Sequence, residues 1–370
     1  MENDIILVIV VGTALAFDFT NGFHDTANVV ATSISTRAMA PRVAVGYAAI
    51  LNFAGAFISQ AVAATVAKDV VDLPVQPDAL LIVFGGLVGA IAWNLITWYF
   101  GLPSSSSHAL IGGVVGAAIA AEGTGAVIGE GLVGKVVIPA LLAPTLAFLV
   151  AGVAILVVYR IVGALRPGPV TRGFHLGQVL SGGLLALAHG TNDAQKTMGV
   201  ITLALVANGT ISGEDFHVPS WVVISAATAI ALGTYAGGWR IIRTMGSRIH
   251  KMDSAQGFAA QGGGAAVILA SSHVGFPLST THTISGAVIG AGAAKRVSAV
   301  RWGVAGNIVA AWIITLPAAA GIGALTYGFT RIFGTGATGA VVVSALIVAG
   351  AAAVFARRLQ QTAAVPATEV

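Results

Sequence analysis

The chain has 370 residues, of which 56% are hydrophobic and only 9% are charged. A water-soluble domain carries about 25% charged residues, so this composition excludes an ordinary soluble fold. No cysteine is present, which excludes disulfides, thiolate metal sites and cysteine nucleophiles. The net charge of +4 does not indicate nucleic-acid binding, because the basic residues are spread over short loops between apolar blocks.

Apolar blocks of about 20 residues recur along the whole chain, and each can cross a hydrocarbon core roughly 30 Å thick. They predict an all-α membrane protein with about 10 to 12 transmembrane helices. The expected crossings are 5–22, 43–66, 79–100, 104–121, 136–159, 174–206, 220–238, 259–275, 279–293, 303–328 and 338–356. The segments 104–121 and 279–293 begin with serine or threonine, and re-entrant hairpins are the alternative there. Because the first block follows an acidic start, we expect a retained span rather than a cleaved signal peptide.

The distribution of basic residues predicts the orientation in the membrane. Lys and Arg favour cytoplasmic loops. With the N-terminus outside, 14 of the 18 basic residues fall in the expected inner loops, only Lys68, Lys135 and Arg331 fall outside, and Lys196 lies within an apolar segment. We therefore predict an external N-terminus, an internal C-terminus and no soluble domain.

Two motifs occur once in each half of the chain. Residues 22–28 (GFHDTAN) correspond to residues 190–196 (GTNDAQK), 168 positions later, and residues 103–108 (PSSSSH) correspond to 277–282 (PLSTTH), 174 positions later. An odd number of crossings separates the matched segments, so the pattern predicts two inverted-topology repeats. Secondary transporters commonly have this architecture, with the substrate site near the membrane midplane. The expected parts are a first repeat 1–160, a cytoplasmic linker 161–173, a second repeat 174–330, and an additional helix and tail 331–370.

Three acids, Asp18, Asp25 and Asp193, lie within apolar segments. A carboxylate at the bilayer centre costs roughly 2.5–3.5 kcal/mol on insertion scales, and a bound cation or proton commonly offsets this cost. Asp25 and Asp193 hold matched positions in the two halves, so we expect both to be functional. The position matched to Asp18 is Ala186, and for Asp18 a structural hydrogen bond remains open as the alternative.

The serine and threonine runs predict two helix starts that face an anion. Proline suits the first turn of a helix and serine caps it. A helix N-terminus attracts anions, because unpaired N–H groups and the positive end of the dipole converge there. Two such helices facing one cavity would hold a tetrahedral oxyanion, whereas plain capping is the alternative. The hydroxyls concerned are those of Ser105, Ser106, Ser107, Ser279, Thr280 and Thr281.

Basic groups beside the motifs are candidate accessory residues. Lys196 follows Asp193 by three residues on one helical face, and it either neutralises Asp193 or contacts the anion. Each nearby histidine, taken alone, is an ordinary buried hydrogen-bonding group, but as a set beside two aspartates they are candidates for a proton relay. These histidines are His24, His108, His189 and His282. No His-x-x-x-His spacing supports a metal site, and none is predicted.

At these motifs, and over essentially its full length, the chain resembles the inorganic phosphate transporter (PiT) family. The family signature is Gly-x-Asn-Asp, which Gly190 to Asp193 match, whereas the first half has His24 at the asparagine position. This departure resembles the bacterial low-affinity branch, whose members are similar proton-coupled carriers of phosphate, often as a neutral metal–phosphate complex. It makes H+ the expected coupling ion and Na+ the alternative.

The resemblance also implies roles for individual residues, a homodimer, and a place in the cell membrane with the lipid bilayer around it. Phosphate would contact Asp25, Ser105, Ser106, Asn192, Asp193, Ser279 and Thr280. The coupling ion would involve Asp25, Asn28, Asp193 and His24, with Ser107, His108, Lys196, Thr281 and His282 as accessory residues.

Four functions can be compared with these features of the sequence. The first is a symporter of inorganic phosphate, and the second is a sulfate permease of the same family. The third is an anion channel, which needs no buried titratable groups and is therefore disfavoured by Asp25 and Asp193. The fourth is an intramembrane hydrolase, which is disfavoured because the serine runs start helices and because acyl transfer needs no duplicated site. We therefore expect a transporter rather than an enzyme, with no cofactor and no nucleic-acid partner.

Overall fold

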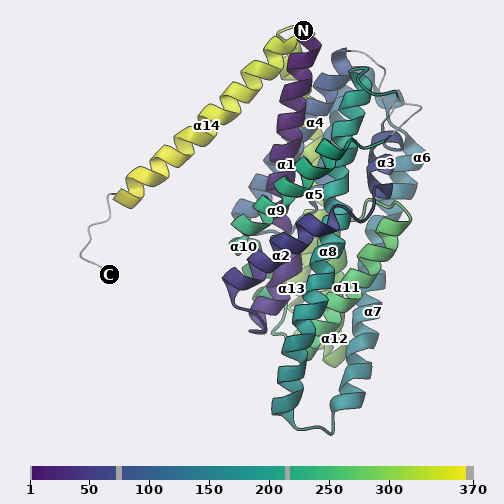
Figure 1. The fold of residues 1–370 in the computed structure, drawn as a ribbon, viewed down its shortest axis with the longest axis vertical. Helices are drawn as coiled ribbons and strands as arrows, with labels where there is room; N and C mark the ends of the chain where they lie inside the picture. Colours follow the sequence, from purple (N-terminus) through teal and green to yellow (C-terminus); the bar gives the residue numbers. More distant parts are fainter. Residues whose placement is uncertain (1, 72–76, 213–216, 364–370) are drawn as a thin grey trace.

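A computed structural model describes residues 2–71, 77–212 and 217–363, and nearly all of them are helical (Figure 1). Within these ranges the only β-type pairing is an isolated bridge between Val71 and Val127. In chain order the helices are α1 (Glu2–Ser35), α2 (Pro41–Gly55), α3 (Ala61–Lys68), α4 (Pro77–Phe100), α5 (Ser106–Glu122), η1 (Thr124–Ala126), α6 (Gly129–Gly131), η2 (Leu132–Val137), α7 (Ile138–Val162), α8 (Pro167–Ala207), α9 (Ser220–Ala236), α10 (Trp239–Arg243), η3 (Thr244–Arg248), α11 (Ser254–His273), α12 (Thr280–Lys295), η4 (Val297–Ala299), α13 (Trp302–Arg331) and α14 (Ala337–Ala363).

The side chains on the outside of the bundle confirm an all-α membrane protein. Large apolar side chains such as Leu141 of α7 and Ile313 and Leu325 of α13 are exposed, whereas the buried set is rich in polar groups. This distribution suits a hydrocarbon solvent. Judged by length and hydropathy over the described residues, four helical segments can span a membrane, namely Glu2–Ser35, Asp78–Phe100, Gly129–Val162 and Trp302–Arg331. The pair α9 and α10–η3, bent by 60°, supplies a fifth if it is one broken span.

Three expected segments differ in detail from the structure. The crossing expected over 43–66 is interrupted, because α2 ends at Gly55 and α3 begins at Ala61. The loop expected over 239–258 contains α10 and η3; the preceding turn is made by Gly237, whose φ of 71° suits a residue without a side chain. Helix α8 begins at Pro167, inside the expected linker 161–173, since proline fits the first turn of a helix.

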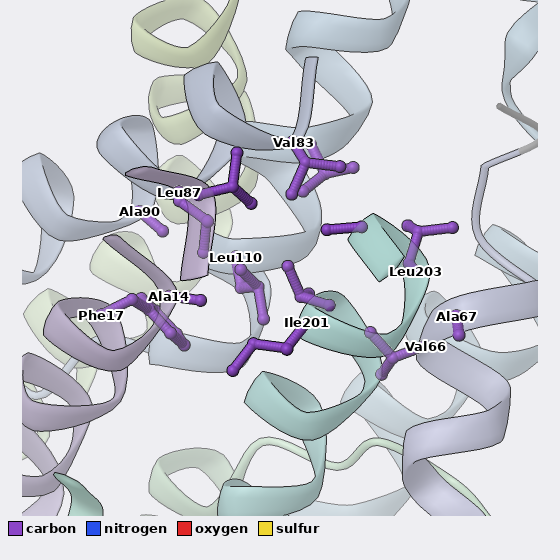
Figure 2. Close-up of a cluster of buried hydrophobic side chains, with 14 of the residues drawn as sticks. Ala14, Phe17, Val66, Ala67, Val83, Leu87, Ala90, Leu110, Ile201 and Leu203 are labelled. Carbon is purple, nitrogen blue, oxygen red and sulfur yellow. The ribbon is translucent and has the colours of Figure 1, made fainter. Parts of the chain in front are cut away.

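The interior of the bundle combines an apolar core with the motif helices. Figure 2 shows Phe17 of α1, Val66 of α3, Leu87 of α4, Leu110 of α5 and Ile201 of α8 within this core. The core therefore joins helices from both halves of the chain and fixes α1, α5 and α8 relative to one another.

Helices from the two halves pair across the molecule. Helix α1 packs against α9, α2 against α8, α5 against α13, and α7 against α12. In Figure 1, α1 descends from the N-terminus at the top, whereas α8 rises from the loop at the foot of the bundle. Two motif glycines permit close approach at two of these contacts. A Cβ on Gly22 would collide with the Ile230 carbonyl of α9, and a Cβ on Gly190 with the Asn52 carbonyl of α2.

Candidate substrate and coupling site

The N-termini of α5 and α12 meet the middle of α1 and α8. Each of the two short helices begins with a side-chain cap, as the sequence predicted. The His108 N–H donates to Ser105 Oγ at 3.1 Å, and the His282 N–H donates to Ser279 Oγ at 3.2 Å. The hydroxyls of Ser105 and Ser279 are therefore engaged in capping, and the residues that follow them reach the aspartates.

Asp25 of α1 is buried and accepts hydrogen bonds from both halves of the chain. The Ser106 hydroxyl donates to Asp25 Oδ2 at 2.6 Å, and the Thr281 hydroxyl donates to Asp25 Oδ1 at 3.2 Å. His24 Nδ1 lies 2.7 Å from Asp25 Oδ1. The other ring nitrogen of His24 lies 3.1 Å from the Thr97 hydroxyl. Asp25 is thus held by three polar neighbours from α1, α5 and α12.

Asp193 of α8 is buried and has a cation beside it. Lys196 Nζ donates to Asp193 Oδ1, to Ser107 Oγ at 2.5 Å and to the Leu278 carbonyl at 2.7 Å. These three acceptors use all three protons of the ammonium group. The Thr280 hydroxyl donates to Asp193 Oδ2 at 3.1 Å. Of the two roles considered for Lys196, these contacts are those of a counter-ion for Asp193.

Two of the four motif histidines contact the aspartates, and two do not. His24 lies beside Asp25, and His189 Nε2 lies 3.0 Å from Asp193 Oδ2, at an angle that does not form a hydrogen bond. His108 and His282 instead pack edge to face, with ring centroids 4.7 Å apart. His282 also stacks on the Trp312 ring of α13 at 4.1 Å.

Asn52 orients the His189 ring beside Asp193. His189 Nδ1 lies 3.2 Å from Asn52 Oδ1, an atom that only accepts hydrogen bonds, so this ring nitrogen carries a proton. In a neutral imidazole the other nitrogen, Nε2, then bears a lone pair, and it lies 3.0 Å from Asp193 Oδ2.

Asn192 and Asn28 take second-layer positions. Asn192 Nδ2 donates to Ser272 Oγ at 2.8 Å and to the Phe276 carbonyl at 3.3 Å, while its Oδ1 has no partner among the described residues. Asn28 Nδ2 donates to Thr281 Oγ1 at 2.9 Å and is 3.5 Å from Thr280 Oγ1. Both amides therefore orient the α12 end of the site.

Sequence reasoning missed several polar residues that support these groups. Asn52 contacts His189, Thr97 contacts His24, and the Gln195 Oε1 atom accepts the Val62 N–H of α3 at 2.8 Å. The signal was present, since Asn52 and Thr97 are polar residues within long apolar blocks. It was too weak to assign partners, because those partners lie on helices far away in the sequence.

Three of the buried groups form a potential cation site. One ligand atom each from Asp25, His189 and Asp193 lies within 4.8 Å of the other two. The sequence predicted no such group, because its members come from both halves and have no joint spacing. With Lys196 charged and both carboxylates ionised, the cluster carries one net negative charge, so an incoming anion needs a cation with it.

Comparison with known proteins identifies the fold and the family. Residues 21–323 match the sequence profile described as the phosphate transporter family. The chain belongs to the phosphate transporter family. A protein of Mycobacterium leprae (strain TN) is 53% identical over 355 residues, 96% of this chain and 85% of its own length. A protein of Rhizobium meliloti (strain 1021) is 49% identical over 87% of this chain and 96% of its own. Both are called probable low-affinity inorganic phosphate transporters.

A solved structure shares the fold. It is named the sodium-dependent phosphate transporter, and it matches with a TM-score of 0.81 over 88% of this chain and 99% of its own, at 24% identity. Family membership confirms a multi-pass cell-membrane transporter and decides against the hydrolase. The likeness to the solved structure supports the fold only and carries no residue roles.

Proposed function

We propose that the protein is a symporter that moves inorganic phosphate across the cell membrane together with protons. The observation that carries the proposal is the pairing of two buried carboxylates, each with a histidine of its own, at the N-termini of α5 and α12. Asp25 has His24 and Asp193 has His189. Helix N-termini suit an oxyanion, and carboxylate–histidine pairs suit protons.

The hydroxyls that would hold phosphate are the same ones that hold the carboxylates. Ser106 donates to Asp25 and Thr280 donates to Asp193. When phosphate arrives, these hydroxyls turn to its oxygens, and each aspartate loses a donor while gaining an anionic neighbour. A carboxylate in that position holds a proton more tightly. Phosphate binding therefore promotes proton binding, which is the coupling a symporter requires.

The remaining site residues complete the proposed phosphate and ion contacts. Ser105 and Ser279 cap the two helix starts through the backbone N–H groups of His108 and His282, and the proposed anion lies at these starts beside Asn192. Asn28 and Lys196 keep the hydroxyls of Thr281 and Ser107 in place. His108 and His282 remain accessory, since they contact each other rather than the aspartates.

Specific observations support two alternative coupling ions and one alternative cargo. The trio Asp25, His189 and Asp193 could receive a divalent metal carried with the phosphate. Sodium is the second alternative, because the solved structural neighbour is named a sodium-dependent transporter. Sulfate has the same tetrahedral shape as phosphate, and a neutral-donor site accepts both.

We also propose that the two halves, 1–160 and 174–330, are inverted repeats within a homodimeric protein. The support for inversion is the opposite course of α1 and α8 and the crosswise pairing of α5 with α13 and of α12 with α7. Residues 161–173 join the halves, and residues 331–370 add α14, whose tail from residue 364 lies outside the described residues.

Uptake of labelled phosphate into proteoliposomes tests the proposal. An inward pH gradient at fixed membrane potential should drive accumulation without sodium, and excess sulfate should compete weakly. Uptake that requires sodium and ignores the pH gradient would contradict proton coupling. A linear, uncoupled flux would instead support a channel. Separate arms with and without a divalent metal distinguish phosphate from its metal complex.

A further inference from the structure

A second buried polar cluster lies on α1 and α8, toward the N-terminal end of α1 from the central site. Asp18, Asn21 and Asp25 are spaced three and four residues apart, so they share one face of α1. Thr197 follows Asp193 by four residues and shares its face of α8. Thr197 and Asn21 lie near Asp18 without forming a hydrogen bond to it, so the three side chains make one polar cluster.

Four polar atoms of this cluster are unsatisfied among the described residues. Both carboxylate oxygens of Asp18, the Oδ1 atom of Asn21 and the hydroxyl of Thr197 are buried without a hydrogen-bond partner. A buried ion without partners is far costlier than a buried neutral group. The Thr197 hydroxyl and the Asn21 amide are potential donors, but neither forms a hydrogen bond with Asp18, so both carboxylate oxygens stay unpaired among the described residues.

Among the residues that the structure describes, no neighbouring cation is free to neutralise Asp18. Its charged neighbours are Asp193 and Lys196 of α8, and the ammonium protons of Lys196 are already bound to Asp193, Ser107 and the Leu278 carbonyl. Helix α9 has no charged residue, and the only one on α4 is Asp78 in its first turn. On α1 itself the nearest titratable groups are His24 and Asp25, which bind each other.

On the other helices packed on α1, apart from α14, the charged groups lie in the end turns. They are Arg42 of α2, Arg240 and Arg243 of α10, Arg248 of η3, Glu122 of α5, His273 of α11 and Lys295 of α12. Two histidines, His108 and His282, lie in the first turns of α5 and α12 and contact each other.

Two of the three cluster residues have apolar counterparts in the other half. The positions matched to Asp18 and Thr197 by the 168-residue offset are Ala186 and Val29, which cannot hold a proton, whereas the position matched to Asn21 is His189. If these polar groups served only to pack a motif helix, the other half would need them as well. Their presence on one side of the site indicates a directional role.

We propose that the Asp18 carboxyl carries the coupling proton between the solvent at the N-terminal end of α1 and the central site. The proposal rests on the proton symport proposed above. A hydronium ion gives its proton to an Asp18 oxygen and leaves as water, and the resulting O–H donates to Asn21 Oδ1 or Thr197 Oγ1. The proton then passes to a water molecule in the central site, and the Asp18 carboxylate is regenerated.

The test compares two transport modes of the same proteoliposomes. Asp18→Asn should lose accumulation driven by a pH gradient while it retains phosphate exchange, because exchange requires no net proton movement. Asp18→Glu should retain both modes. Thr197→Val, which installs the residue of the other half, should shift the pH dependence of uptake. Asp69→Asn, a change in an exposed acid paired with Lys135, is the control and should behave as the wild type.

Each contrary outcome has a distinct meaning. If the wild type ignores the pH gradient, proton symport fails and the Asp18 assignment falls with it. If the wild type follows the gradient and Asp18→Asn does so equally, only the Asp18 assignment fails. Labelled sodium that binds to the wild type and not to Asp18→Asn would make this a sodium site and overturn the proton assignment.

A spectroscopic measurement keeps the proposal testable should Asp18→Asn not fold. Infrared difference spectra between low and high pH should show the carbonyl stretch of a protonated carboxyl in the wild type. The band should shift in Thr197→Val and in Asp18→Glu, because the local hydrogen bonding changes. A spectrum identical in all three proteins would show that the titrating carboxyl lies elsewhere.

Discussion

The two halves of the chain hold their aspartates in the same way, with a hydroxyl from the first residue of that half's short helix. Ser106 donates to Asp25 at 2.6 Å, and Thr280 donates to Asp193 at 3.1 Å. Each half also reaches across to the other. Matched geometry of this kind shows that both short helices serve one common site.

The two halves differ in the charge of the side chain that contacts the other half. Asn28 of the first half donates to Thr281, whereas Lys196, at the matched position, donates to Ser107 and to Asp193. A neutral amide on one side and an ammonium on the other make an unequal pair of carboxylates. Asp193 has Lys196 as a counter-ion and Asp25 has none, so in the symport proposed above Asp25 depends more on a transported cation.

The largest expected effect is a difference in protein stability between variants of the two aspartates. Asp25→Asn and Asp193→Asn should both abolish phosphate accumulation, because each removes a coupling carboxylate. Asp193→Asn should also destabilise the protein by about 3–5 kcal/mol, since it leaves Lys196 buried and unpaired. Thermal unfolding followed by size-exclusion chromatography checks this difference. Equal melting temperatures for the two variants would contradict the counter-ion role.

A second prediction makes the two halves alike. Lys196→Asn installs the residue of the first half and leaves both carboxylates without a fixed cation. We expect phosphate affinity to fall roughly tenfold, comparable to the loss of one charge-assisted hydrogen bond. The loss should be smaller at lower pH, because protons then replace the missing charge. A loss that is independent of pH would argue that Lys196 contacts phosphate directly.

A third prediction concerns the hydroxyls. Ser106→Ala and Thr280→Ala should each weaken phosphate binding by roughly 2- to 12-fold, since a hydrogen bond contributes about 0.5–1.5 kcal/mol. The two effects should be similar if the halves act symmetrically. Thr145→Ala, which removes a hydroxyl bonded to the Leu141 carbonyl on the exposed face of α7, is the matched control. Unchanged affinity in the double variant would remove both hydroxyls from the site.

The smallest expected effect lies at the start of α11. Asp253 accepts from the Gln256 N–H at 2.9 Å in a capping box, and from Tyr159 and Lys295. Burial raises the pKa of Asp253, but these hydrogen bonds outweigh it, so the pKa lies below its ordinary value. Asp253 therefore contributes its full stabilisation of the folded state above the pKa of an unfolded aspartate, about 3.9. This contribution is lost as the pH falls through the lower pKa of Asp253 in the folded state.

Replacing Asp253 by Asn keeps a side chain that can cap the helix but removes the charge that Lys295 contacts, so it should cost about 0.2–1 kcal/mol at neutral pH. In the first half, Asp78 lies in the first turn of α4 and pairs with Arg331 at 3.0 Å. The variant Asp78→Asn provides the matched comparison, and chemical denaturation of both in detergent gives the two free energies. A larger loss for Asp78→Asn would show that the ion pair outweighs the capping box.

The sequence predicted the features that depend on local pattern. Apolar length identified a membrane fold, and the matched motifs located Asp25, Asp193 and the capped starts at Ser105 and Ser279. Features that depend on tertiary packing could not be read in this way. The three acceptors of Lys196 include Ser107 and a carbonyl at residue 278, far apart in the chain.

The assignment of serines within each run was likewise beyond the sequence. Neighbouring hydroxyls in a run look equivalent, yet Ser105 caps its helix while Ser106 reaches Asp25. Their roles depend on the direction in which each side chain leaves the first turn, which only the structure shows. The break between α2 and α3 was also missed, because residues 56–60 are not markedly polar as a group.

The crosswise helix pairing has a consequence for biogenesis. Gly22 of α1 fits against the backbone of α9, and α9 is synthesised some two hundred residues later. The first motif helix must therefore wait in the bilayer with its buried polar face unmatched until the second half has been inserted. If the chain were divided in the loop between α7 and α8, we expect that neither half would fold alone. Both halves would have to be expressed together to recover the assembled protein.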